Sequence, residues 1–437
     1  MNKLTKLLIG IALADLLAAI DSTSVNVAAP NIAHFFNLAP NVVSWIQTLY
    51  ILALIIILIP AGKIGDLKGH KRNFLAGLIV FGLASLGIIF VQNYILILLL
   101  RILQGAAAAV LYTASGALVA HNWKNTEAAF GMTAAFFSLG LLIGPIVGGV
   151  FSDLQIWGWQ GWHFIFAINI PIVLISLILV NKNCPETYRS KDPINLDFIG
   201  LFLLTIFLGS LTYLLTQKYY LSITIAALIS LILLIWYESK KKNALINLDM
   251  FKNQTFAAIS VFTLVIMFIV IGMSFINTFY IQDILHKSAT TTGIYLLPIF
   301  LGMGGFAFLA GQFRNWRISA IVASVLIIVS MYILSRVNPD VSYFKGLFWG
   351  YLIASASGGL MMTNTFAAAL GSVQKQFSGL ASGYINTVQQ IGSLGGIAFV
   401  AGQNILVNYQ KVYFFLMIIG IIALISSCFV KNKSVSE

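Results

Sequence analysis

Residues 62–72, GKIGDLKGHKR, form a short charged stretch between two long apolar runs. Its basic residues are Lys63, Lys68, Lys71 and Arg72. A connection so short and so basic stays on the cytoplasmic side of a membrane, because moving its charges across the bilayer is costly. The stretch therefore predicts a cytoplasmic turn that joins two membrane-spanning helices and orients the other spans.

The remaining residues of this turn carry a second signal. Gly62, Gly65 and Gly69 allow two helix ends to approach closely, and Asp66 is the only acid among the bases. We expect Asp66 to pair with a neighbouring cation or to cap a helix N-terminus. A plain basic anchor would need neither the glycines nor the acid.

The composition on both sides of the turn is that of a helical membrane protein. The chain has 437 residues, of which 59% are hydrophobic and 9% are charged. Apolar runs of about twenty residues match a hydrocarbon core of about 30 Å, and the alternating patterns of barrel strands are absent. The net charge of +12 lies in short connections, where it serves topology, so no nucleic-acid partner is predicted. Cys184 and Cys428 have no partner at disulfide or metal-ligand spacing.

The apolar runs predict about fourteen spans, the first of which is a retained helix rather than a cleaved signal. When both termini are placed on the cytoplasmic side, the connections that fall on that side hold most of the 25 basic residues. The long polar connections 181–197 and 238–254 then divide the chain into an N-terminal six-helix half (1–181), two inserted spans (182–253) and a C-terminal six-helix half (254–437). The predicted spans are 7–28, 42–62, 73–92, 94–120, 129–152, 161–181, 196–216, 219–237, 254–280, 292–312, 317–334, 343–369, 378–404 and 411–430.

Charged and polar residues inside these spans are the candidate functional residues. Asp15 and Asp21 lie in the first span, about 240° apart around the helix, and each must face a cavity, find a partner or stay protonated. Polar residues, among them Asn26, follow Asp21. Asp15 lacks such a run, and its position fits a structural role and a functional role equally well. In the fourth span Arg101 and Gln104 share one helix face, and Arg101 either snorkels to the interface or acts in function.

Glycines at fourfold spacing make a flat face on the fifth span. They are Gly140, Gly144, Gly148 and Gly149, and Pro145 adds a kink. The pattern fits a simple helix-packing groove, and it also fits a hinge and seal between two states. In the span 378–404 the candidates for a cavity wall are Asn386, Gln389 and Gln390.

These motifs resemble those of the major facilitator superfamily and, within it, of the fourteen-span drug:proton antiporters. GKIGDLKGHKR is similar to the loop motif between spans two and three, with His70 in place of an arginine. IDSTSVNVAAP is similar to the first-span motif, whose acid Asp21 matches, and RILQGAAAAV to the fourth-span motif associated with proton transfer. GLLIGPIVGG resembles the motif that marks exporters, and GWHFIFAINIP resembles the sixth-span motif.

The resemblance implies a major facilitator fold of two six-helix halves plus two extra central spans, an all-α polytopic protein of the cytoplasmic membrane. It implies proton-coupled export of amphipathic small molecules, including cationic ones, by alternating access. Asp21 would exchange proton for substrate, Arg101 would bias the protonation of Asp21, and the glycine-rich fifth span would gate. No cofactor, metal or catalytic constellation is expected, since an ion gradient supplies the energy. The alternatives are an exporter of an endogenous metabolite or lipid on the same scaffold, and a membrane sensor or scaffold that transports nothing.

Overall fold

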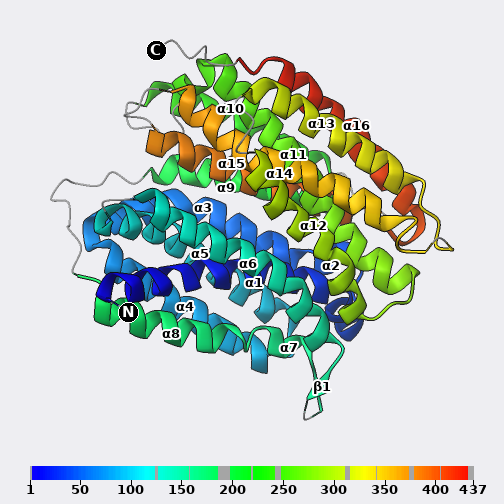
Figure 1. Cartoon of the computed structure of the whole chain (residues 1–437), viewed down its shortest axis with the longest axis horizontal. Coiled ribbons are helices and arrows are strands. Elements are labelled where there is room, and N and C mark those ends of the chain that lie inside the picture. Colours follow the sequence, from blue (N-terminus) through cyan, green and yellow to red (C-terminus); the bar gives the residue numbers. More distant parts are fainter. Residues whose placement is uncertain are drawn as a thin grey trace. The chain divides into compact units, whose positions relative to one another are not determined.

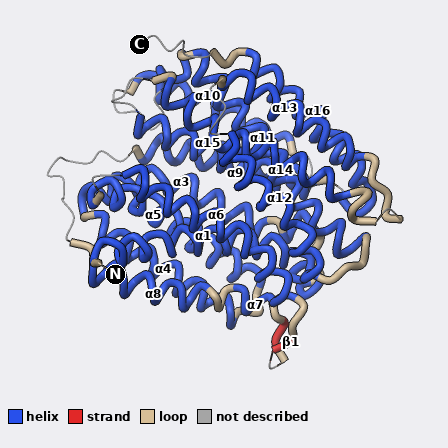
Figure 2. The backbone as a smooth tube through the Cα atoms, in the orientation of Figure 1, coloured by secondary structure: helices blue, strands red, loops and turns tan. Residues whose placement is uncertain are grey.

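The computed structural model describes residues 2–123, 126–156, 158–185, 197–217, 220–241, 248–310, 315–340, 342–373, 378–403 and 405–431. Within these ranges the backbone is nearly all helical, and the strands are one short antiparallel pair, β1 (Gln155–Ile156) and β2 (Trp159–Gln160), as Figure 2 shows. Residues 186–196 and 242–247, which lie in the predicted domain-boundary connections 181–197 and 238–254, are outside the described residues. The division at those connections therefore stays a prediction.

The helices follow one another along the chain, as Figure 1 shows. In the first part of the chain they are α1 (Lys3–Phe36), α2 (Pro40–Val43), α3 (Trp45–Lys68), α4 (His70–Phe90), α5 (Tyr94–Asn122), α6 (Thr126–Ser152), α7 (Trp162–Ile165) and α8 (Asn169–Asn183). They continue with α9 (Phe198–Thr216), α10 (Leu221–Lys240), α11 (Gln254–Phe279), α12 (Ala289–Ala310), α13 (Trp316–Ser335), α14 (Leu347–Gly371), α15 (Ser378–Gly402) and α16 (Ile405–Cys428). Two short turns flank α11, the 3₁₀ turn η1 (Leu248–Lys252) and the π-helical turn η2 (Tyr280–Ile284).

Eleven of the described helical segments are long and apolar enough to cross a membrane. Each of the helices α1, α14 and α15 also has at least 25 residues, although they are not among those eleven. The fold is thus all-α, as predicted, and the exact number of spans stays a prediction.

The chain divides into two compact units. Unit 1 comprises Met1–Ala39, Val43–Thr205 and Ser288–Ile294, and unit 2 comprises Pro40–Val42, Ile206–Lys287 and Tyr295–Glu437. In unit 1, α1 is the central helix, because it packs on α5, α6 and α8; α1 and α6 run side by side in Figure 1. In unit 2, α11 takes the corresponding place, packed on α14, α15 and α16.

The stretch 62–72 is more helical than predicted. Helix α3 continues to Lys68 and α4 begins at His70, so that Gly69 alone separates the two helices. Gly69 has a φ of 93°, a conformation that a side chain would strain. The charged residues thus extend two helices rather than forming a loop.

The predicted span 161–181 is also different, because it is broken into α7 and α8. The break lies in the FIFAIN segment, just before Asn169 at the start of α8. This interruption places the Asn169 side chain in the interior of unit 1, where it is 1% exposed.

Candidate functional site

A buried ion pair lies at the centre of unit 1. The Nη1 atom of Arg101 on α5 is 2.6 Å from the Oδ2 atom of Asp21 on α1, and both side chains are fully shielded. The pairing of α1 with α5 at this point joins the two most conspicuous charges of the predicted spans. The structure therefore excludes the interpretation in which Arg101 snorkels to the interface.

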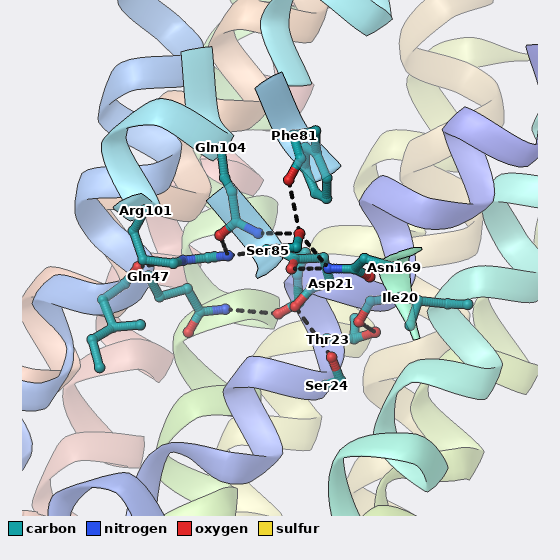
Figure 3. Close-up of polar contacts among 12 residues, drawn as sticks. Ile20, Asp21, Thr23, Ser24, Gln47, Phe81, Ser85, Arg101, Gln104 and Asn169 are labelled. Atoms are coloured by element: carbon teal, nitrogen blue, oxygen red, sulfur yellow. Dashed lines mark hydrogen bonds and ion pairs between the residues drawn. The ribbon is translucent and has the colours of Figure 1, made fainter. Parts of the chain in front are cut away.

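Polar side chains from three helices surround this pair (Figure 3). Asn169 on α8 donates to Asp21 Oδ1 over 3.0 Å, and Arg101 Nη1 donates to the Gln104 side-chain oxygen over 2.8 Å. Ser85 on α4 accepts from Gln104 at 2.8 Å and from Asn169 at 3.1 Å. Its own hydroxyl donates to the Phe81 carbonyl at 2.9 Å. We call Asp21, Arg101, Gln104, Ser85 and Asn169 the buried polar network.

The guanidinium of Arg101 is held from the α3 side as well. Its Nε donates to the Ile46 carbonyl over 3.0 Å, and its Cζ lies 4.3 Å from the centre of the Tyr50 ring. Gly105 makes this approach feasible, because a Cβ there would collide with the Tyr50 carbonyl oxygen. The glycine after Gln104 in the sequence is therefore a packing requirement for the arginine.

The stability of this ion pair depends on the charge of both partners. Two charges buried together compensate each other's desolvation, whereas a lone buried charge is strongly destabilising. Hydrogen bonds from Asn169 and to Gln104 satisfy further atoms of the pair. Protonation of Asp21 would remove that compensation and leave the charge of Arg101 with neutral partners.

Asp15 lies outside this network. Its Oδ2 accepts a hydrogen bond from the Ser115 hydroxyl of α5 over 3.1 Å, and its side chain is partly exposed, whereas Asp21 is 1% exposed. The two acids thus point to different partners, as their spacing along α1 requires. One is locked in a network, and the other has a hydroxyl contact.

The glycines of α6 pack directly on the backbone of α1. A Cβ at Gly140 would lie 2.6 Å from the Leu16 carbonyl oxygen, one at Gly144 would collide with the Thr23 hydroxyl, and one at Gly148 with the Ser24 carbonyl. These residues flank Asp21 on α1. The small residues of α6 therefore set how closely that helix approaches the segment that carries the ion pair.

Gly149 and Pro145 belong to a second contact of α6. A Cβ at Gly149 would collide with the Ala289 carbonyl, and one at Gly293 with the Pro145 carbonyl. Asp153, just beyond the end of α6, accepts from the backbone N–H of Ala289 at 3.0 Å and of Thr290 at 2.7 Å. Asp153, which directly follows α6, thus caps the first turn of α12. These residues all belong to unit 1.

The charged stretch at residues 62–72 forms a separate cluster. His70 Nε2 lies 3.0 Å from Asp66 Oδ1, so the acid pairs with the histidine that replaces the motif arginine. A Cβ at Gly65 would lie 2.5 Å from the His70 ring, whereas one at Gly62 would make only an ordinary contact, 3.9 Å from the Thr113 methyl group. Lys71 and Arg72 follow in the first turn of α4. These residues are not part of the buried polar network.

The other candidates are scattered. Asn26 is buried on α1. On α15 in unit 2, Gln389 is 8% exposed, Gln390 is partly exposed and Asn386 is exposed. These residues are not members of the buried polar network, and their assignment to a cavity wall stays a prediction.

Two members of the network were not among the predicted residues. Asn169 lies within the sequence GWHFIFAINIP, where its motif position was the available signal, and Ser85 lies in an apolar run that carries no signal. Among the described residues no group of three or more His, Cys, Asp or Glu side chains has a metal-binding arrangement.

The family model of the Major Facilitator Superfamily matches residues 11–397 of this chain. The methylenomycin A resistance protein of Bacillus subtilis (strain 168) is 28% identical over 90% of this chain and 85% of its own. The multidrug resistance protein Stp of Mycobacterium tuberculosis (strain ATCC 25618 / H37Rv) is 26% identical over 87% of this chain and 72% of its own. The inward-facing, unoccupied structure of a bacterial homologue of the human lysosomal transporter Spinster superimposes with a TM-score of 0.72 at 16% identity, over 98% of this chain and 96% of that one.

Proposed function

The chain belongs to the Major Facilitator Superfamily, and from this premise we propose that it exports amphipathic small molecules, cationic ones included, in exchange for protons. Relatives named for resistance to methylenomycin A and to multiple drugs support the export of such compounds. The buried pair of Asp21 and Arg101 supports proton coupling, because ionisable residues inside membrane spans are costly and typically mark proton or substrate pathways.

The observation that carries the proposal is the 2.6 Å contact between Asp21 and Arg101 in a fully shielded place. In the proposed cycle, Asp21 takes a proton from the outer side and loses its attraction for Arg101. Asn169 and Gln104 hold the two side chains in place while the charge changes. Return of the proton to the cytoplasm restores the ion pair, and the free-energy difference between the two arrangements biases the conformational equilibrium.

The glycine face of α6 is proposed to act as the gate. Gly140, Gly144 and Gly148 contact the α1 segment that bears Asp21, so a shift of α1 is passed to α6 without intervening side chains. Gly62, Asp66, Gly69, Lys71 and Arg72 are proposed to stabilise one access state at the cytoplasmic ends of α3 and α4.

The proposal includes the membrane topology. The eleven apolar helices together with α1, α14 and α15 make up the fourteen predicted spans, with two inserted spans between two six-helix halves. Both termini are then on the cytoplasmic side of the cell membrane, and the partners are protons, a small-molecule substrate and the bilayer.

Proton release from purified protein tests the coupling. Addition of a transported compound to detergent-solubilised wild type at near-neutral pH should release protons, and Asp21→Asn should release none, because its amide mimics the protonated acid. Inside-out vesicles carrying the same variants should show proton-driven uptake for wild type and none for Asp21→Asn. Release or uptake at the wild-type level in Asp21→Asn would remove Asp21 from the mechanism.

A further inference from the structure

Asp15 has no ionic partner among the described residues. Its Oδ2 atom accepts a hydrogen bond from the Ser115 hydroxyl at 3.1 Å. Asp21, six positions further along α1, has Arg101 at 2.6 Å and Asn169 at 3.0 Å. One hydroxyl compensates a carboxylate far less than a guanidinium does.

The position of Asp15 in α1 limits the environment that the exposed part of its side chain can have. The residue lies inside α1, and a charge directed to hydrocarbon is costly, so ionisable residues in spans face the bundle interior or a water-filled space. Asp15 is partly exposed, and Ser22, two turns further along the same helix face, is partly exposed as well. The exposed side of Asp15 is therefore part of a polar face of α1.

Two aromatic rings lie beside this face. Tyr112 lies one turn before Ser115 on α5, and Ser115 is the residue that donates to Asp15. Its ring meets that of Phe137 on α6 edge to face, with 6.2 Å between the ring centres. Both side chains are partly exposed. A carboxylate next to exposed aromatic faces is the chemistry by which proteins bind organic cations.

We propose that Asp15, Tyr112 and Phe137 form a binding site for the cationic group of a transported organic cation, separate from the Asp21–Arg101 pair. This inference rests on the proposed export function and divides its tasks between two acids. Asp15 supplies the charge complement of the cargo, and the aromatic rings supply cation–π contacts. The Asp21–Arg101 pair carries the proton coupling, so neutral compounds need Asp21 and do not need Asp15.

Equilibrium binding of radiolabelled tetraphenylphosphonium to purified protein tests the site. Asp15→Asn should weaken binding about tenfold or more, since a carboxylate beside a cation is lost, and Asp15→Glu should restore most of the affinity. Tyr112→Leu should weaken binding, whereas Tyr112→Phe, which keeps the ring, should bind like wild type. Asp340→Asn, an exposed acid in the connection between α13 and α14, is the matched acid-to-amide control and should leave the affinity unchanged.

The outcomes separate this inference from the proposed function. Equal affinity for tetraphenylphosphonium in wild type and Asp15→Asn overturns the site, and so does a wild type that binds no tetraphenylphosphonium but exports neutral compounds. If Asp15→Asn elutes as aggregated protein, the Tyr112→Leu and Tyr112→Phe pair decides, because equal affinities in these two variants overturn the site. Failure of proton-driven transport for every compound would overturn the export function. The binding measurements on Asp15 variants do not depend on transport and would still test the site.

Discussion

At the scale of single residues, the structure divides two aspartates of one helix into different chemical situations. Asp21 is embedded in a network of one guanidinium, two amides and a hydroxyl, as Figure 3 shows. Asp15 has a hydroxyl partner and partial exposure. In the sequence, both acids are costly because both lie in an apolar span. The contacts that each acid makes follow from the packing of α1 on α5 and α8.

The Asp21–Arg101 pair predicts a non-additive response to mutation. Arg101→Gln should destabilise the protein by about 3–5 kcal/mol, because it leaves the Asp21 carboxylate buried without a counter-charge. The double variant Asp21→Asn/Arg101→Gln should regain at least about 1 kcal/mol over the single variant, since no lone charge remains. Thermal unfolding in detergent, monitored by size-exclusion chromatography, measures both effects.

Arg336→Gln is the control for this cycle. Arg336 is exposed and lies over the Tyr332 ring at 5.3 Å, so its loss should change stability by less than about 1 kcal/mol. A double variant that is less stable than Arg101→Gln would show that the pair does not act as a compensated unit.

Sequence reasoning located the charges of this network and missed part of their shell. Asp21, Arg101 and Gln104 stand out because charged and amide side chains are costly in an apolar span. Ser85 does not, since a serine in a helix satisfies its hydroxyl on its own backbone, and here it also bridges Gln104 and Asn169. The Ile46 carbonyl, which accepts from Arg101, carries no side-chain signal at all.

At the scale of the elements, the contact of α6 with α1 depends on the absence of side chains. Gly144→Ala should destabilise the protein by about 1–3 kcal/mol and slow export, because the added methyl group collides with the Thr23 hydroxyl and lies 3.0 Å from the Ile20 carbonyl. Thermal unfolding and vesicle uptake are the measurements. Adding Thr23→Ala to Gly144→Ala should recover part of the loss.

Gly131→Ala is a matched control on the same helix. A Cβ at Gly131 meets nothing within 4 Å, so this variant should be neutral or slightly more stable, by up to about 1 kcal/mol, from its better helix propensity. Equal stability and equal transport in Gly144→Ala and Gly131→Ala would contradict the gating role of the α6 face.

Helix boundaries were predicted closely where an apolar run ends in polar residues, as for α9 (Phe198–Thr216), expected at 196–216. They were wrong at residues 62–72, where the polar residues continue the two helices instead of ending them. Charge marks the membrane boundary in such a sequence, and it does not mark the end of a helix. Glycine at position 69, with its φ of 93°, marks that end.

At the scale of the whole molecule, the two units do not follow the order of the chain. Residues 288–294, which begin α12, belong to unit 1, and the helix from Tyr295 onward belongs to unit 2. Asp153 and the close contacts of Gly149 and Gly293 hold this first turn in unit 1. Pro298 lies within α12 just beyond this point, where a missing backbone N–H makes a helix easier to bend.

The Asp153 cap predicts a local effect that reaches two helices. Asp153→Ala should speed amide hydrogen exchange in the first turn of α12 and also at the end of α6, because the cap joins the two. Ser288→Ala is the control, since Ser288 accepts from the Thr291 backbone N–H within the same turn and forms no hydrogen bond to the described residues of α6. Exchange measured by mass spectrometry should rise in α12 alone for Ser288→Ala; an unchanged α6 in Asp153→Ala would show that the cap does not couple them.

The assignment of residues 288–294 to unit 1 also bears on the order of synthesis. A ribosome produces α1 to α8 well before it reaches Ser288, so the contact surface of Gly149 and Asp153 stays uncovered while the intervening helices are being made. Pro40–Val42 show the reverse, since they are made early and belong to unit 2, where Asn41 donates to Gln217 over 3.2 Å. Unit 1 is therefore complete only once residues 288–294 have been translated, and a nascent chain halted before Ser288 would hold an incomplete unit 1 beside the first part of unit 2.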